Sequence, residues 1–182
     1  MTAGYTIRPV RADEWREARA LRLAALTDEA AGIAFLETYD EAVVRPDDFW
    51  QERTARSSSD AGPEADVRQF VAVADDGTWV GTAAALVEKA GTEDYSGETI
   101  AQDAGHVVAV YLHPDHRGRG VMEDLFDAAT GWFRERGLRR ARLHVHEDNA
   151  RAERFYARYG FRPTGEGFDG PHGWEREMVL PL

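Results

Sequence analysis

The chain has 182 residues, of which 43% are hydrophobic and 30% are charged, a balance that favours one globular domain spanning residues 1–182 over a disordered or fibrous chain. Its formal net charge of -11 argues against non-specific nucleic-acid binding, which needs clustered cations. The absence of cysteine excludes disulfides, thiolate metal sites and an acyl-cysteine intermediate on this chain.

The first eight residues lack the basic and apolar regions of a signal peptide, and no apolar run reaches membrane-spanning length. We therefore expect a cytoplasmic protein without a membrane partner.

Residues 5–9 alternate between apolar and polar side chains and end at a proline, which predicts a first strand. A helix capped by Asp13 should follow, and Pro46 predicts a second early helix over residues 49–55. Residues 57–63 are polar and turn-forming, so we expect a flexible surface loop.

The middle of the chain predicts three strands. Residues 69–74 and 79–87 flank an Asp-Asp-Gly-Thr turn, which is typical of an antiparallel hairpin. The acidic residues 88–104 predict a long connection of the kind that is often functional. Residues 106–112 are almost continuously apolar, as expected of a central strand buried on both faces.

The last third alternates helices and strands. An apolar stripe predicts a helix that ends at Gly137, and residues 149–159 predict a second one that ends at Gly160. Strands are expected over residues 141–146, 161–164 and 176–180, with a Gly/Pro-rich turn over residues 165–173. This mixture indicates an α/β (α+β) fold with a mixed sheet.

A glycine-rich turn separates the central strand from the helix that follows it. Gly118 and Gly120 let the backbone approach a pyrophosphate, and the helix start offers free N–H groups. On the turn alone, a phosphate site and an ordinary tight turn with solvated arginines are equally good interpretations. The turn is neither a Walker A loop nor a dinucleotide fingerprint.

The wider string VYLHPDHRGRGV, residues 110–121, closely resembles motif A of the GNAT N-acetyltransferase superfamily, whose core is Gln/Arg-x-x-Gly-x-Gly/Ala. Arg117 and Gly120 match its first and fourth positions, and Met122 stands where the family usually has glycine or alanine. The resemblance implies that acetyl-CoA binds at this turn. The residues that it implicates are Val110, Leu112, Arg117, Gly118, Arg119, Gly120, Val121 and Met122.

A second string, NARAERFYARYGF over residues 149–161, resembles motif B of the same superfamily. The resemblance is tight from about residue 106 to residue 161. It implies a GNAT fold with a mixed central sheet of about six to seven strands flanked by about four helices. It also implies that the Asn149 amide contacts the pantetheine arm, although an asparagine before a helix is ordinarily an N-cap.

Acetyl transfer to an amine needs a base, an oxyanion site and an acid for the leaving thiolate. Tyr156 occupies the family's position for that acid, but the same residue also belongs to an apolar stripe that predicts packing in the core. His106 begins the central strand where several resembling enzymes carry a catalytic glutamate, and a neutral imidazole could take the proton. Asp103, Glu98, a water chain or a purely structural His106 are the alternatives.

The six histidines do not predict a metal site, because no His-Glu-x-x-His helix or cysteine supports a zinc ligand set. His144 and His146 project to one face of one strand, where a surface or core role is expected. His113 and His116 flank the glycine-rich turn and should be solvated.

The resemblance predicts an acetyl-CoA-dependent N-acetyltransferase without an acyl-enzyme, acting on a primary amine of a small molecule or peptide. A non-catalytic acetyl-CoA sensor and an adaptor for another acyl-CoA are the alternatives, and a homodimer stays open. Phe35, Tyr39, Tyr95, Trp174 and residues 88–104 are candidates for an acceptor pocket, which the sequence does not resolve from packing or surface roles.

Overall fold

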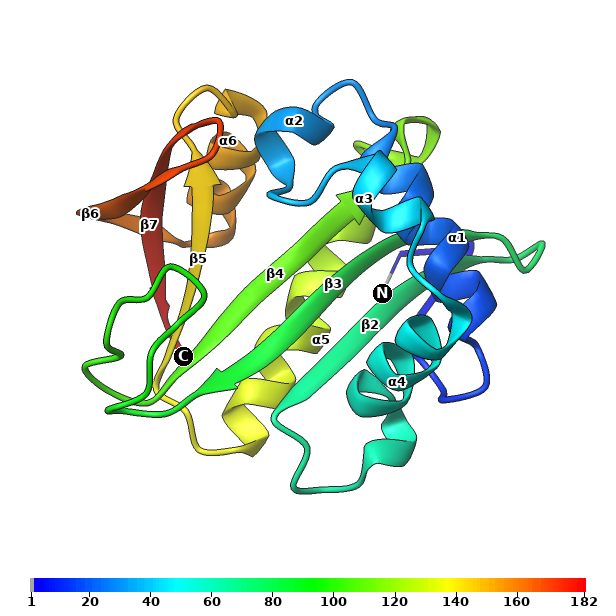
Figure 1. Ribbon diagram of the computed structural model, residues 1–182, viewed down its shortest axis with the longest axis horizontal. Helices are drawn as coiled ribbons and strands as arrows, with labels where there is room; N and C mark the ends of the chain where they lie inside the picture. The colour runs from blue at the N-terminus through cyan, green and yellow to red at the C-terminus, as the bar shows by residue number, and fades with distance from the viewer. Residues whose placement is uncertain (1) are drawn as a thin grey trace.

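A seven-stranded sheet forms the centre of the computed structural model, which describes residues 2–182 (Figure 1). Its strand order is β1-β2-β3-β4-β5-β7-β6. The strands are β1 (Tyr5–Pro9), β2 (Val67–Ala74), β3 (Trp79–Glu88), β4 (Ala104–Leu112), β5 (Arg140–His146), β6 (Arg162–Gly170) and β7 (Gly173–Pro181). The prediction of a mixed GNAT-type sheet is confirmed.

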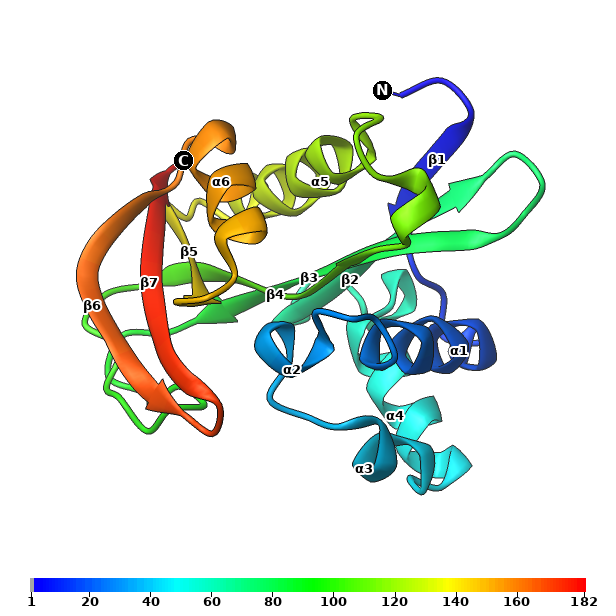
Figure 2. The ribbon, with the colours of Figure 1, turned by 90° about the horizontal axis from the view of Figure 1, so that it is seen from above.

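Helices cover both faces of the sheet. They are α1 (Trp15–Leu26), α2 (Ala31–Ala34), α3 (Tyr39–Val43), α4 (Asp47–Ser57), α5 (Val121–Glu135) and α6 (Ala150–Tyr159), with 3-10 turns at η1 (Ser59–Ala61) and η2 (Pro114–His116). Figure 2 shows α5 and α6 on one face of the sheet and α1 to α4 on the other. The count exceeds the four helices expected because α2 and α3 are single turns of four and five residues.

The apolar stripe of α5 builds the largest core cluster. Leu125, Phe126, Ala129 and Phe133 are fully buried against the sheet. Burying a large apolar side chain stabilises the fold by roughly 1.5–3 kcal/mol, so this helix anchors the strands beneath it. Gly105 of β4 is necessary for that packing, because a Cβ atom there would overlap the Phe133 ring. The stripe predicted from the sequence therefore faces the core.

The sheet opens between β4 and β5. Across residues 2–182 these two strands form the one parallel pair, and they pair only at Gly105 with Ala141 and at His106 with Arg142. Beyond those positions the strands diverge, and β4 is further distorted at Ala109, whose φ is +52°. The register of β4 against β3 shifts at the same place, which marks a β-bulge. Because β5 leaves it there, the middle of β4 is partly exposed rather than buried on both faces as predicted.

Two N-terminal predictions were wrong. Glu14 rather than Asp13 lies at the start of α1, and its carboxylate accepts hydrogen bonds from the Arg11 amide and the Arg8 guanidinium. Residues 57–63 are not a surface loop throughout: they include the end of α4 and the turn η1, Ser58 is fully buried, and the Arg68 side chain donates to the carbonyls of Ser58 and Gly62. These corrections come from long-range partners that local sequence does not reveal.

The C-terminal hairpin is longer than predicted. Strands β6 and β7 reach Gly170 and Gly173, so the turn is confined to residues 171–172 and does not span residues 165–173. The register between the two strands shifts between Pro163 and Gly167, which breaks the alternating pattern expected of a regular strand. The extension places Glu175 beside the end of β5, opposite His146.

Candidate active site

A cavity of about 890 Å³ lies at the opening between β4 and β5. Its wall includes the bulged middle of β4, the glycine-rich turn, and one face of α6. Residues around α2, together with the ends of β5 and β7, complete the wall. The cavity therefore connects the predicted phosphate-binding turn with the predicted catalytic side chains. Sites at the diverging ends of strands are a recurrent place for ligands in α/β proteins.

The glycine-rich turn leaves the start of α5 open to a ligand. Gly118 and Gly120 have φ values of +73° and +84°, which favour glycine, and Gly120 caps the helix without a side chain. The first amides of a helix have no intrahelical partner, and the helix dipole places partial positive charge there. Both glycines, Val121 and Met122 line the cavity. The turn can therefore receive an anionic group on its backbone.

The arginines of the turn hold its position. Arg117 donates from Nε to the Leu112 carbonyl at 2.9 Å and from Nη2 to Asp28 at 2.5 Å, which ties the turn to the end of β4 and to the segment after α1. Arg119 donates to the Tyr5 hydroxyl at 3.2 Å. Arg117 also donates from its amide to the Pro114 carbonyl at 3.2 Å, so its side chain and its amide are both engaged within the protein and the amides available to a ligand begin at Gly118.

The two histidines beside the turn differ in exposure. His113 is exposed, as predicted. His116 is only partly exposed, because its Nδ1 atom is hydrogen-bonded to the Tyr5 hydroxyl at 2.9 Å. The prediction that both histidines are solvated thus holds fully for His113 and only in part for His116. The partner comes from β1, more than a hundred residues away, so the sequence gives no local sign of it.

Tyr156 is both a core residue and a residue of the cavity wall. Its ring packs beside Phe126, Phe155 and Phe161, and the side chain is 7% exposed. Among residues 2–182 the hydroxyl has no hydrogen-bond partner. Burial, reinforced by the negative charge of Glu175, raises the Tyr156 pKa well above its usual value. The hydroxyl therefore stays protonated at neutral pH and is available as a donor.

Asn149 caps α6 and also contacts the α2 segment. Its Oδ1 atom accepts from the Ala152 amide at 3.2 Å and caps α6, as an asparagine before a helix usually does. Its Nδ2 atom lies 3.5 Å from the Ile33 carbonyl, and the residue lines the cavity. The cap thus joins α6 to the α2 segment across the cavity.

His106 lies at the closed end of the opening, with almost no exposed surface. Its Nδ1 atom is 2.8 Å from the Glu88 carboxylate, and its ring stacks on Tyr95 and meets His144 edge-on. Burial raises the Glu88 pKa, but hydrogen bonds from His106 and Arg142 outweigh it and lower the pKa to about 2. Since an ionised carboxylate only accepts, Nδ1 must carry the proton and Nε2 is the free base in the neutral ring.

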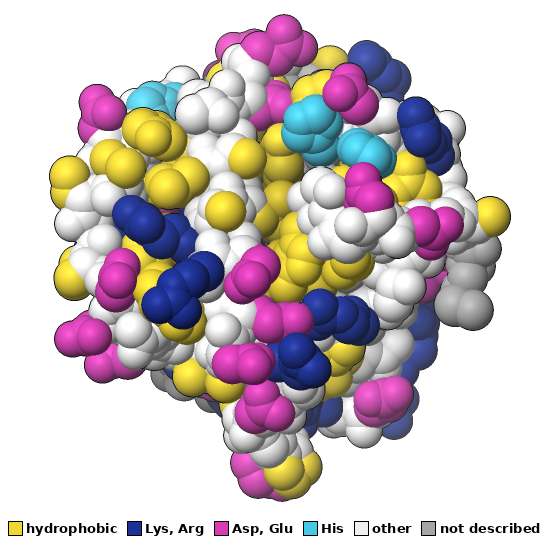
Figure 3. All heavy atoms as spheres, turned by 90° about the vertical axis from the view of Figure 1, so that its right-hand side faces the viewer, with side chains coloured by type: hydrophobic (Ala, Val, Ile, Leu, Met, Phe, Trp, Pro, Cys, Tyr) yellow, Lys and Arg dark blue, Asp and Glu magenta, His cyan; other side chains and the backbone are white. Residues whose placement is uncertain are grey.

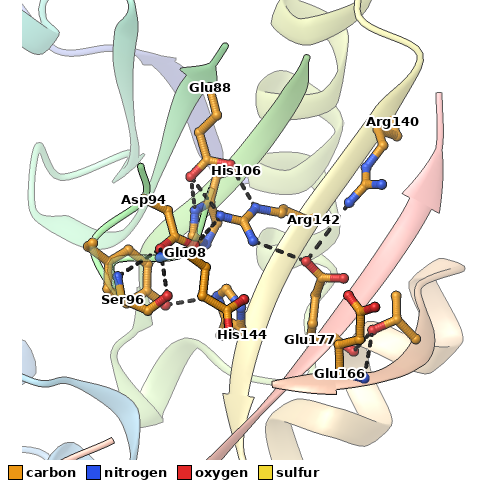
Figure 4. A network of polar contacts seen from close by, with 12 residues as sticks. Glu88, Asp94, Ser96, Glu98, His106, Arg140, Arg142, His144, Glu166 and Glu177 are labelled. Atoms are coloured by element: carbon orange, nitrogen blue, oxygen red, sulfur yellow. Dashed lines mark hydrogen bonds and ion pairs between the residues drawn. The ribbon is translucent and has the colours of Figure 1, made fainter. Parts of the chain in front are cut away.

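Arg142 of β5 organises the network around that histidine (Figure 4). It donates to Glu88 at 2.7 and 3.0 Å, to Asp94 at 2.6 Å and to Glu177 at 3.0 Å. These carboxylates come from β3, the long connection before β4, and β7. Burial lowers the Arg142 pKa, but the carboxylates outweigh it and keep the guanidinium charged. The network closes the sheet where β4 and β5 begin to part.

Arg142→Met is expected to destabilise the protein by roughly 3–5 kcal/mol at neutral pH, because it leaves buried carboxylates unpaired. The Glu88 pKa is lowered in the fold from 4.5 to about 2, so its stabilising contribution is complete above pH 4.5 and is lost as pH falls towards 2. Urea unfolding at pH 7 and pH 3 should therefore show a smaller acid-induced loss in the variant.

Arg140→Met is the matched control for that experiment. Arg140 lies on the same strand, is 30% exposed and approaches Glu177 only to 3.9 Å, so the loss should stay below about 1 kcal/mol. Equal losses of unfolding free energy in the two variants would show that the buried network stabilises the protein no more than an exposed ion pair does.

His144 and His146 line the cavity, and a hydrogen bond within the protein holds each ring in place. His144 Nδ1 is hydrogen-bonded to the Tyr95 hydroxyl at 2.8 Å. Burial, followed by the charges of His106 and Arg142, lowers the His144 pKa to about 3, so the ring is neutral. His146 is buried and contacts the His172 carbonyl at 3.0 Å. Within residues 2–182, no three His, Cys, Asp or Glu side chains are grouped as metal ligands would be.

Only some of the residues predicted to form the acceptor pocket line the cavity. Phe35 and Tyr95 line it, whereas Tyr39 and Trp174 do not. The alternative bases Asp103 and Glu98 also lie outside the wall, and Asp103 pairs with Lys89 at 2.8 Å. The candidate pocket is therefore narrower than the set of aromatic and acidic residues named from the sequence.

Sequence reasoning missed most of the charged residues of the wall, among them Arg22, Arg45, Arg53 and Glu175. Glu175 is half-buried, and burial raises its pKa although His146 and His172 oppose the shift. The sequence did not indicate Glu175 as a site residue, because it lies next to the predicted Gly/Pro-rich turn. Alternation along a longer β7 would have been the signal, and that strand was not predicted to extend so far.

The comparisons with known proteins agree with this architecture. The family model described as "Acetyltransferase (GNAT) family" matches residues 10–161. The chain belongs to this family.

The chain is 34% identical over 128 residues to a streptothricin acetyltransferase of Streptomyces lavendulae, covering 66% of this chain and 62% of that protein. A mycothiol acetyltransferase of Geodermatophilus obscurus is 29% identical over 135 residues, covering 61% of this chain and 44% of that one. The chain spans less than two thirds of each curated relative that it matches.

Among solved structures, a phosphinothricin acetyltransferase of Sinorhizobium meliloti in complex with AcCoA superposes with a TM-score of 0.70 at 18% identity. The match covers 98% of this chain and 89% of that one. At this identity the likeness shows the fold.

The described surface carries mixed charge. Figure 3 shows acidic and basic side chains interspersed on the right-hand face of Figure 1, without a broad patch of one sign among the residues drawn in colour. Between residues 2 and 182, every helix is too short or too polar to cross a membrane.

Proposed function

We propose that residues 1–182 act as one N-acetyltransferase domain, which moves an acetyl group from acetyl-CoA to a primary amine of a small molecule or peptide. One observation carries the proposal: a single cavity connects the open start of α5 with Tyr156, His106 and Glu175. A phosphate-binding turn, an acid and a base are the parts that direct acetyl transfer needs. The net charge of -11 favours cationic amines over nucleic acid as partners. We place this activity in the cytoplasm.

Acetyl-CoA fits the turn through its backbone. The pyrophosphate would lie on the amides of residues 118–122, where two glycines with positive φ leave the backbone accessible and the Arg117 amide is already bonded to Pro114. Val110 and Leu112 of the diverging β4, with Asn149 across the cavity, would flank the pantetheine arm. Support comes from the match to the acetyltransferase family and from the AcCoA complex of a protein with the same fold.

Gly120→Val is expected to weaken acetyl-CoA binding by about tenfold or more. A side chain at this φ of +84° is strained, and its Cβ would approach the Thr2 hydroxyl to 3.0 Å beside the phosphate-binding amides. Calorimetric titration with acetyl-CoA measures the loss. Gly131→Ala in the same helix is the control, because its Cβ meets nothing within 4 Å. Unchanged affinity in Gly120→Val would reject this site for the pyrophosphate.

The proposed reaction begins with proton removal from the acceptor ammonium, since an alkyl amine has a pKa of about 10.4. His106 Nε2 accepts that proton through water, because its ring is 1% exposed and covered by Tyr95. Glu88 holds the ring in the Nδ1–H tautomer and stabilises the resulting imidazolium.

The free amine then attacks the thioester carbonyl and forms a C–N bond. Backbone amides of β4 at its divergence from β5 stabilise the oxyanion. When the intermediate collapses, the C–S bond breaks and the Tyr156 hydroxyl gives its proton to the CoA thiolate. The raised pKa of Tyr156 suits a donor that must remain protonated until that moment.

Release of free CoA with a panel of amines tests this function. A thiol-reactive dye reports CoA without background, because the protein contains no cysteine. Amine-dependent CoA release, with the acetylated amine identified by mass spectrometry, is the expected result. Tight acetyl-CoA binding without turnover on any amine would instead favour the non-catalytic sensor.

A further inference from the structure

Three arginines gather on one wall of the cavity. This arginine cluster consists of Arg22 of α1, Arg45 between α3 and α4, and Arg53 of α4, and all three line the cavity. Glu37 is the carboxylate among them: it accepts from Arg22 at 3.0 and 3.2 Å and lies 3.8 Å from Arg45. Three cations against one carboxylate leave two positive charges uncompensated there.

The members of the cluster differ in how they are held. The Arg22 guanidinium stacks 4.5 Å from the Phe35 ring centroid, and Arg45 stacks 4.8 Å from that of Phe49. Rings and Glu37 thus fix two of the three side chains in place. Within residues 2–182, the Arg53 guanidinium has neither an ion-pair nor a hydrogen-bond partner. Within the cluster, Arg53 is therefore the member whose guanidinium is free to receive a ligand.

The cluster lies beside the reaction centre and away from the pyrophosphate turn. Arg22 and Arg53 share a small hollow with Ala109, the bulged residue of β4. Helices α1 and α4 cover the face of the sheet opposite to α5 and α6 (Figure 2). The cluster and the start of α5 thus belong to elements on opposite faces of the sheet, at different parts of the cavity wall, so acetyl-CoA phosphates bound at α5 as proposed would not neutralise these charges.

Uncompensated cations in an otherwise acidic protein indicate an anionic ligand. Arg53 is exposed along the cavity, where the like charges of Arg22 and Arg45 face it and Glu37 is the opposing charge. The other carboxylates of the wall are elsewhere: Asp28 pairs with Arg117, Glu123 belongs to α5, and Glu175 belongs to β7. An incoming carboxylate would relieve this repulsion and form charge-assisted hydrogen bonds with a free guanidinium.

We propose that the arginine cluster binds a carboxylate of the acceptor, so that the substrate is a primary amine that also bears a carboxylate. This inference rests on the proposed acetyl transfer and narrows its substrate class. The substrate lies across the cavity, with its carboxylate on Arg53 and Arg22 and its amine directed to the side of Glu175 and His106. Diamines and polyamines are disfavoured, because their second cation would face the arginines.

Matched amines test the preference. ω-Aminocarboxylates of graded length are compared with alkyl amines and diamines of the same length, with CoA release as the readout. We expect kcat/KM to be about tenfold or more higher for an aminocarboxylate than for its neutral or dicationic counterpart. Equal or higher kcat/KM values for alkyl amines or diamines would overturn the carboxylate assignment and leave the acetyltransferase function intact.

The Arg53→Gln variant tests whether the arginine cluster causes the preference for aminocarboxylates. It should raise KM for aminocarboxylates by about tenfold while leaving KM for acetyl-CoA and for neutral amines unchanged. Arg56→Gln is the matched control on the same helix, because Arg56 is exposed, pairs with Asp66 at 2.9 Å and lies outside the cavity wall. If the two variants behave alike, the cluster does not bind the acceptor.

A binding measurement separates this inference from the proposed function. Calorimetry with the aminocarboxylates, in the presence of CoA, needs no turnover. If no amine releases CoA, the acetyltransferase proposal fails. Aminocarboxylate binding that Arg53→Gln weakens and Arg56→Gln preserves would then still support the carboxylate site. Absence of such binding to the unaltered protein would reject it.

Discussion

Tyr156→Phe is expected to lower kcat by roughly ten- to a thousandfold without loss of folding or of acetyl-CoA affinity. The change removes one hydroxyl and keeps the ring between Phe126, Phe155 and Phe161. Because that hydroxyl has no partner among residues 2–182, its removal leaves no buried group unsatisfied. Single-turnover kinetics measure the chemical step, and thermal unfolding checks the fold.

Tyr159→Phe is the control on the same helix. The Tyr159 hydroxyl donates to Asp127 at 2.7 Å and contacts Thr130, and the residue lies outside the cavity wall. This variant should lose some stability, on the order of 1 kcal/mol, with kcat unchanged. A chemical step as fast in Tyr156→Phe as in Tyr159→Phe would reduce Tyr156 to a core residue.

His106→Ala is expected to lower kcat/KM by roughly a hundred- to ten-thousandfold and to abolish the acidic limb of its pH profile. In the unaltered enzyme kcat/KM should rise with pH, because a general base can accept the ammonium proton only in its unprotonated form. Acetyl-CoA binding should persist, since the turn at α5 does not involve His106. The profile of kcat/KM against pH, with calorimetry for acetyl-CoA, checks both expectations.

Glu175 provides the competing interpretation of that limb. It is a half-buried carboxylate of the cavity wall with a raised pKa, so it could also act as a base. Glu175→Gln should leave the limb in place if His106 is the base. Loss of the limb in Glu175→Gln, together with its persistence in His106→Ala, would transfer the role to Glu175 and return His106 to a structural part of the Arg142 network.

The sequence by itself determined the elements that depend on neighbouring residues. The turn at Gly118 and Gly120 was predictable because positive φ needs glycine and because an apolar helical stripe follows directly. Strand β1 matches residues 5–9 as predicted, and the hairpin of β2 and β3 follows from its turn. The resemblance of residues 110–121 and 149–161 to two GNAT motifs was enough to identify the family, which the comparison confirmed.

Tertiary structure alone decided which charged groups meet. Glu88 and Arg142 are 54 positions apart, and their contact depends on β5 lying beside β4 at His106. Arg22 and Arg53 meet because α1 and α4 pack on the same face of the sheet. Neither pairing has a local signal: periodicity tells which face of an element is apolar, whereas strand order and helix packing decide which polar side chains share a buried space.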